Sequence, residues 1–172
     1  MATRVVPVQP GKQPELAAID ATIAARRGNV SLLYQVLLNS PPIADGWEKM
    51  LTAVRNRTTL PADLRELVIL RVAVLNHAPF EFAAHAPIAV AAGVSAAKLD
   101  ALREPMPGAA FSALERAVLV LTDTMTRDVQ VGDAVFEPLR AHFSEQGLVE
   151  LVATVAAYNM VSRFLEALRI GH

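Results

Sequence analysis

Glu81 and His85 are two side chains whose types and spacing suit proton transfer. Residues four apart on a helix share a face and lie about 6 Å apart along its axis. A carboxylate beside an imidazole fixes its tautomer and favours its charged form, and an imidazole exchanges protons near neutral pH. We therefore predict an acid–base pair in an otherwise apolar segment. The same spacing also fits a partly buried structural pair with no catalytic role.

Glu66 is a further carboxylate that could join this pair. It lies in the almost uniformly apolar segment Leu64–Leu75, where a carboxylate must be exposed, paired or hydrogen-bonded. Two arrangements satisfy this requirement. Arg71 is its partner, or Glu66 points into the same pocket as His85, because a turn at Asn76–Pro79 would join the two segments as a hairpin.

His77 raises the question of a metal site, because it precedes Glu81 by four residues, as Glu81 precedes His85. Pro79 argues against one continuous helix through all three positions. Without that helix the three side chains do not share a face, so we predict no metal.

The elements that position these residues are expected to be helices. Alanine, the best helix former, accounts for 30 of the 172 residues, and no long strand-like alternation occurs. Start and stop signals favour an all-α fold with eight or nine helices. The expected helices are Pro14–Arg27, Val30–Leu38, a helix carrying Trp47 to Val54, Ala62–Leu75, Phe80–Ala92, Ser95–Arg103, Ser112–Thr126, Asp133–Glu145 and Leu148–Arg169.

Composition excludes several classes of function. The chain has no cysteine, so it has neither disulfides nor a thiol nucleophile. Its net charge of −1 gives no electrostatic footprint for nucleic acid. The longest apolar stretches are interrupted, so we expect no membrane span, and the start of the chain does not resemble a signal peptide. We expect a cytoplasmic protein with an extended arm, residues 1–10, and a single domain, residues 11–172.

An ordered set of short segments resembles the carboxymuconolactone decarboxylase family, which includes the alkyl hydroperoxidase D branch. The resemblance covers roughly residues 30–170. Its segments are Leu64-Arg-Glu66-Leu-Val-Ile-Leu-Arg-Val-Ala, Glu81-Phe-Ala-Ala-His85, Ile88-Ala89, Ala92-Gly93-Val-Ser95, Leu99, Leu38-Asn-Ser-Pro before Trp47, and Tyr158-Asn-Met-Val-Ser-Arg163.

This resemblance implies an all-α homo-oligomer, a trimer or hexamer, that acts on a small molecule; we expect no cofactor. The peroxidase branch has a Cys-x-x-Cys motif, a glutamate and a histidine. Here Glu66 and His85 match the last two, while Ala78 and Glu81 occupy the cysteine positions, which excludes that branch's thiol chemistry. The decarboxylase branch is more similar, although its members are usually shorter.

The resemblance and the residues together predict decarboxylase-like proton transfer on a small organic acid or lactone. His85 would be the acid–base group, Glu81 would orient it, and Glu66 would support it. Arg71 or Arg163 would hold a substrate carboxylate. Other residues would line the pocket: Tyr34, Trp47, Phe80 and Phe82. The alternative is a non-catalytic homo-oligomer that binds a small ligand or serves as an assembly unit.

Overall fold

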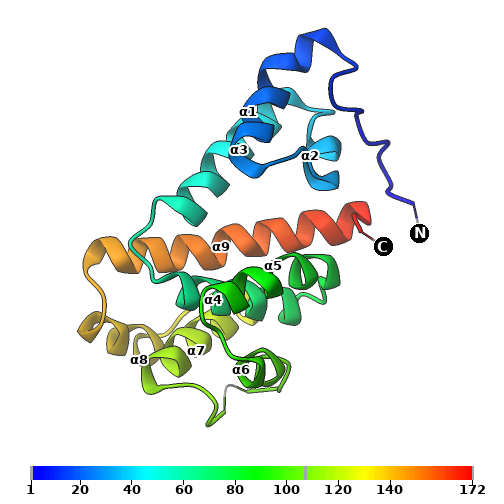
Figure 1. Ribbon diagram of the computed structural model, residues 1–172. Helices are drawn as coiled ribbons and strands as arrows, with labels where there is room; N and C mark the ends of the chain where they lie inside the picture. The colour runs from blue at the N-terminus through cyan, green and yellow to red at the C-terminus, as the bar shows by residue number, and fades with distance from the viewer. Residues whose placement is uncertain (1, 107, 172) are drawn as a thin grey trace. The chain divides into compact units, whose positions relative to one another are not determined.

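The computed structural model describes residues 2–106 and 108–171 (Figure 1). Within these ranges the regular elements are nine α-helices and two short 3₁₀ segments, with no strand. The all-α prediction is confirmed. Two compact units divide the chain: residues 1–57 with 165–172, and residues 58–164. The predicted arm contains no helix over residues 2–9. Its end is not a unit boundary, and the single domain over residues 11–172 stays a prediction.

The first unit contains three α-helices whose starts and stops follow local chemistry. They are α1 (Ala17–Arg27), preceded by a 3₁₀ turn at Pro14–Leu16, then α2 (Leu32–Leu37) and α3 (Pro41–Asn56). Gly28 ends α1 with a φ of 82°, a left-handed conformation that glycine adopts without strain. Two prolines open α3, where the first backbone N–H groups need no helical acceptor.

A buried glutamate, Glu48, ties α1, α2 and α3 together. Its carboxylate accepts hydrogen bonds from the Tyr34 hydroxyl at 2.6 Å, the Arg27 Nε at 2.9 Å and the Thr52 hydroxyl at 2.5 Å. Burial raises the pKa of the Glu48 carboxyl, but these hydrogen bonds outweigh burial, and the pKa lies below its ordinary value. Burial and the hydrogen bond to Glu48 together raise the pKa of Tyr34.

The second unit is built around α4, which is buried on almost every side. Its helices are α4 (Ala62–Leu75), α5 (Pro79–Ala91), α6 (Ala96–Ala101), α7 (Ala113–Arg127), α8 (Asp133–Phe136) and most of α9 (Glu145–Leu168), with a 3₁₀ segment at Glu137–Ala141. The last four residues of α9 belong to the first unit. α4 packs most closely against α5 and α7. A cluster of buried apolar side chains joins these elements: Leu67, Leu70, Ala89, Val94, Leu102, Phe111 and Leu119.

Capping explains two of the helix starts in this unit. Ser112 and Glu115 form the predicted capping box of α7, in which each side chain accepts a backbone N–H from the other residue. Ser95 caps α6 by accepting the backbone N–H of Lys98.

The prediction of a helix over Asp133–Glu145 was wrong. The segment divides into α8 and a 3₁₀ turn, because Pro138 lacks the backbone N–H that an α-helix requires there. The predicted break between this helix and the helix Leu148–Arg169 is also wrong, because Gly147 does not separate two helices. It lies in the first turn of α9, and the Ser144 hydroxyl accepts its backbone N–H at 3.2 Å.

The last helix, α9, is long and apolar enough to cross a membrane by length and composition alone. The interruptions at Glu150 and Asn159 therefore do not exclude a span by that criterion. Half of its most apolar stretch is buried within the protein, and core helices of soluble proteins meet the same criterion. Leu151, Val155 and Tyr158 are among its buried side chains.

Removing the Glu48 charge should destabilise the first unit in a pH-dependent way. At pH 7, Glu48→Gln should lower the free energy of unfolding by about 1–3 kcal/mol, because charge-assisted hydrogen bonds are lost. The folded-state pKa lies below the ordinary value of 4.5. The stabilisation is therefore complete above the unfolded-state pKa and is lost as pH falls through the folded-state pKa.

Urea unfolding followed by the fluorescence of Trp47, the chain's single tryptophan, measures this effect because Trp47 is adjacent to Glu48 in α3. The difference in the free energy of unfolding between wild type and Glu48→Gln should become smaller as the pH falls below 4.5. Asp45→Asn is the control, since that exposed carboxylate pairs with exposed Lys49. A difference in the free energy of unfolding that does not change with pH would contradict the prediction.

Candidate functional site

Glu66 and His85 form a buried pair between α4 and α5. The His85 Nδ1 lies 2.7 Å from the Glu66 Oε2, and both side chains are less than a tenth exposed. The Asn76–Pro79 turn reverses the chain between the two helices, as predicted for a hairpin. Of the two arrangements open for Glu66, the structure therefore contains the contact with His85 and not one with Arg71.

Tyr158, from α9, reaches the other side of the imidazole. Its hydroxyl lies 3.3 Å from the His85 Nε2, and the two rings meet edge to face with centroids 5.1 Å apart. Tyr158 is 2% exposed. Three helices therefore supply a carboxylate, an imidazole and a phenol in one line.

Glu66 determines which nitrogen of the His85 ring carries the proton. A carboxylate accepts hydrogen bonds, so the neutral imidazole carries its proton on Nδ1 and leaves the Nε2 lone pair to accept the Tyr158 hydroxyl. Arg65 lies near the outer oxygen of Glu66, with its Nε 3.8 Å away. The arrangement can hold a proton on His85 or pass one between His85 and Tyr158.

Glu81 lies one turn before His85 on α5 and is 2% exposed. The expectation that Glu81 orients the imidazole stays a prediction, whereas Glu66 lies against Nδ1 and Tyr158 faces Nε2. Glu66, which comes from the preceding helix, thus holds the ring at Nδ1. Glu81 remains a buried acidic group on the same face of α5.

Arg71 has a structural environment that does not suit substrate binding. Its side chain is 1% exposed, and all five N–H donors are engaged. Two go to the Asp123 carboxylate, at 2.6 and 2.5 Å. The other three reach the backbone carbonyls of Leu102, Glu104 and Pro105 at 2.6, 2.7 and 3.1 Å. We therefore reassign Arg71 from substrate binding to anchoring the segment between α6 and α7.

The remaining predicted residues are dispersed. Arg163 is exposed on α9 and donates to the backbone carbonyl of Asn159 at 3.1 Å and to its side-chain oxygen. Phe80 is half-buried, and Phe82 packs against the apolar cluster of the second unit. Tyr34 and Trp47 lie in the first unit, where Tyr34 serves Glu48.

Two partners in these networks were not assigned from the sequence. Tyr158 was noted only within a segment that resembles the family, and Asp123 was not recognised at all. Each is far from its partner along the chain, by 73 and 52 residues respectively, so local spacing carries no signal. A single polar residue in an apolar helix is the one available hint, since it requires a partner when buried.

The family comparison matches the central part of the chain. A model of the carboxymuconolactone decarboxylase family matches residues 41–123. Over this segment, just under half of the chain, the sequence is similar to the carboxymuconolactone decarboxylase family. The family segment contains Glu66, Glu81 and His85, whereas Tyr158 lies outside it. Among curated proteins, no sequence matches the chain.

Solved structures confirm the alkyl hydroperoxidase D-like fold. An uncharacterised peroxidase-related protein from Silicibacter sp. TM1040 has a TM-score of 0.82 and 17% identity, covering 97% of this chain and 90% of that one. A protein described as an alkylhydroperoxidase AhpD core from Ralstonia eutropha JMP134 has the same score and identity, covering 98% and 90%. A cysteine-to-alanine variant of the debrominase Bmp8 in complex with 2,3,4-tribromopyrrole has a TM-score of 0.80 and 19% identity, covering 98% and 91%. At these identities the similarity shows the fold alone.

Arg71→Leu should lower the free energy of unfolding by about 3–5 kcal/mol, because it leaves Asp123 and three carbonyls without their donor. Arg163→Gln is the matched control and should change stability by less than about 0.5 kcal/mol, since Arg163 is exposed. Urea unfolding followed by circular dichroism compares the two variants. Similar losses in both would contradict a structural role specific to Arg71.

Proposed function

We propose that this protein catalyses proton transfer on a small organic acid or lactone, as a decarboxylase-like enzyme that uses no thiol. The observation that carries the proposal is the buried line from Glu66 through His85 to Tyr158. A carboxylate behind an imidazole supports the positive charge that the ring gains when it accepts a proton. Low exposure strengthens these interactions, because the surroundings are poor in water.

The proposed reaction balances without a cofactor. The bond between the ring carbon and the substrate carboxylate breaks, carbon dioxide leaves, and the electron pair remains on the conjugated lactone as an enolate. Protonated His85 then gives the Nε2 proton to a carbon of this conjugated enolate. Water returns a proton to the imidazole, and Glu66 holds the ring through Nδ1 during both steps. The Tyr158 hydroxyl, near Nε2, is available to relay that proton.

Debromination is the reaction named for the neighbour Bmp8, whose ligand-bound form carries alanine in place of a cysteine. This chain contains no cysteine, so a thiol version of that chemistry has no nucleophile here. Bmp8 supports a narrower point, namely that the fold accommodates a small planar ring. We therefore extend the proposal to planar, unsaturated substrates.

A second candidate function is a non-catalytic homo-oligomer on the same fold. The low exposure of the Glu66–His85 pair supports it, because a fully satisfied buried pair can serve as a structural contact alone. Ile88 and Val90 on α5 are 37% and 56% exposed, and such apolar side chains support assembly with further copies.

Carboxymuconolactone, the compound in the family name, is the first substrate to test. Wild-type protein should release carbon dioxide and, in deuterated water, incorporate one deuterium into the lactone ring for each carbon dioxide released. His85→Gln should lower kcat by about 10²–10⁴-fold, the usual contribution of a general acid–base group. Glu66→Gln should lower it less, because the imidazole remains while its charge support is lost.

Exposed His142 provides the control, and His142→Gln should retain wild-type turnover. Circular dichroism and size-exclusion chromatography establish that each variant keeps its fold and assembly. If His85→Gln unfolds the protein, Glu66→Gln and the deuterium readout still test the chemistry. Absence of turnover by folded wild-type protein across a panel of lactone acids would favour the second candidate.

A further inference from the structure

Two adjoining surface hollows lie at the turn between α4 and α5, outside the buried line. The first has a volume of about 500 Å³ and is lined by Ala73, Val74, His77, Ala78, Pro79, Phe82 and Arg103. The second has a volume of about 320 Å³ and includes Arg103, Glu104 and Arg127. His77, Val74 and Arg103 line both. Glu66, His85 and Tyr158 line neither, so these hollows are separate from the proposed catalytic residues.

Arg103 has a guanidinium whose donors are available. Its Cζ lies 4.1 Å from the centroid of the Phe82 ring, and this is its one side-chain interaction within residues 2–106 and 108–171. A cation–π contact uses the face of the ring and the charge of the guanidinium, but not its N–H groups. Those groups can still form a two-point contact with a carboxylate.

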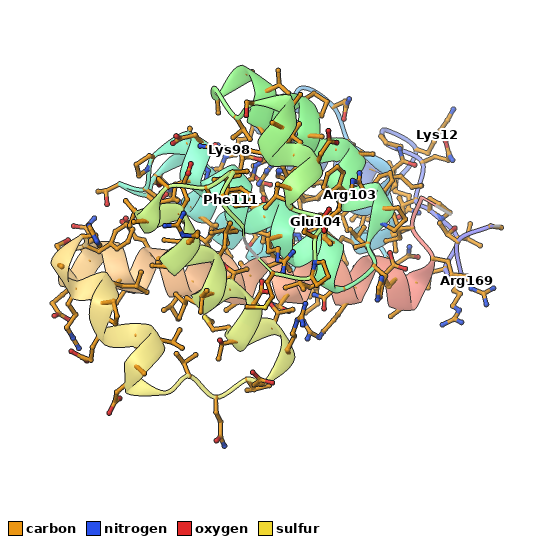
Figure 2. All side chains as sticks on the ribbon, turned by 90° about the horizontal axis from the view of Figure 1, so that it is seen from below. Lys12, Lys98, Arg103, Glu104, Phe111 and Arg169 are labelled. Carbon is orange, nitrogen blue, oxygen red and sulfur yellow. The ribbon has the colours of Figure 1, made fainter. Side chains whose placement is uncertain are left out.

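The backbone around Arg103 is held in place. Buried Arg71 binds the carbonyls of Leu102 and Glu104, which flank Arg103 on both sides (Figure 2 labels Arg103 and Glu104). A rigid support lowers the entropy that a side chain loses on binding a ligand. By holding this backbone in place, Arg71 therefore also pre-organises Arg103.

His77 occupies a backbone conformation that favours glycine. Its φ is +54°, and the backbone N–H groups of His77 and Ala78 bond to the carbonyls of Val74 and Ala73, a pattern that ends many helices. A histidine at this position costs stability compared with glycine. The His77 side chain, for which this backbone conformation is costly, lines both hollows.

The side chains that line the second hollow carry more positive than negative charge. Arg71, Arg103 and Arg127 line it with one carboxylate, Glu104, while Asp123 lies against Arg71. Glu81, in the first turn of α5, lines neither hollow. Glu104 is exposed and opposes an anion in the second hollow only. The N-terminus of α5 at Pro79 adds a partial positive charge to the first.

We propose that these hollows bind a planar organic acid, with its carboxylate on Arg103 and His77 and its apolar ring against Phe82, Val74 and Pro79. The first hollow supplies mainly apolar side chains, which a ring covers and an inorganic anion does not. Arg103 lies at the junction of the two hollows, where a carboxylate on such a ring would meet it. Binding at this site does not require catalysis, so this proposal does not depend on the proposed function.

Isothermal titration with benzoate as the probe tests this site in the full chain. Benzoate should bind more tightly than the neutral isostere benzamide and more tightly than inorganic phosphate. Arg103→Gln should weaken benzoate binding about tenfold or more, as expected for loss of a charge-assisted contact. Arg140→Gln removes an equal charge from an exposed residue that lines neither hollow and should leave binding unchanged.

His77→Gly separates binding from folding. Relief of the left-handed conformation should raise the midpoint of thermal unfolding, while loss of the imidazole should weaken benzoate binding. Benzoate binding that equals benzamide or phosphate binding overturns the proposal. Equal effects of Arg103→Gln and Arg140→Gln also overturn it, because they would reflect net charge alone. A full loss of turnover with benzoate binding intact would affect only the proposed function.

Discussion

α4 is buried on almost all sides, and two of its charged residues, Glu66 and Arg71, are themselves buried. Burying a charge is costly unless a partner of opposite charge or several hydrogen bonds replace water. Each residue therefore dictates which elements pack around α4. Glu66 requires the imidazole from α5, and Arg71 requires the carboxylate from α7 and the carbonyls that follow α6. The apolar cluster provides the bulk of the packing, whereas these two residues specify its geometry.

The two charges have different consequences because their partners differ in chemistry. Imidazole groups in general exchange protons near neutral pH, so the proposed proton transfer rests on the pairing of His85 with Glu66. Arg71 is permanently charged and saturated by five hydrogen bonds, so its pairing only stabilises structure. Because Arg71 fixes the backbone on both sides of Arg103, it also orients that residue, whose own guanidinium remains available at the surface. α4 thus supports the buried Glu66–His85 pair directly and the exposed Arg103 through Arg71.

Local signals in the sequence predict the helices well and their partners poorly. Ala62–Leu75 was predicted with its observed ends, and the Ser112–Glu115 capping box was recognised, because both depend on neighbouring residues. Pro138 was overlooked as a breaker and Gly147 was wrongly given that role. The Glu66–His85 contact was one of two arrangements that a hairpin permits. Tyr158 and Asp123 could not be assigned, because only the folded chain brings them to His85 and Arg71.

The residues at the start of α5 explain how a fold shared with peroxidase-related proteins can serve another chemistry. By the family resemblance, Ala78 and Glu81 occupy positions where the redox branch keeps cysteines. Ala78 lines an apolar hollow, and Glu81 is a buried carboxylate one turn before His85. Without these two thiols the segment offers no thiol chemistry, and the functions proposed above use proton transfer and binding instead. The absence of cysteine is consistent with a buried proton-transfer centre that lies beside an anion-binding surface.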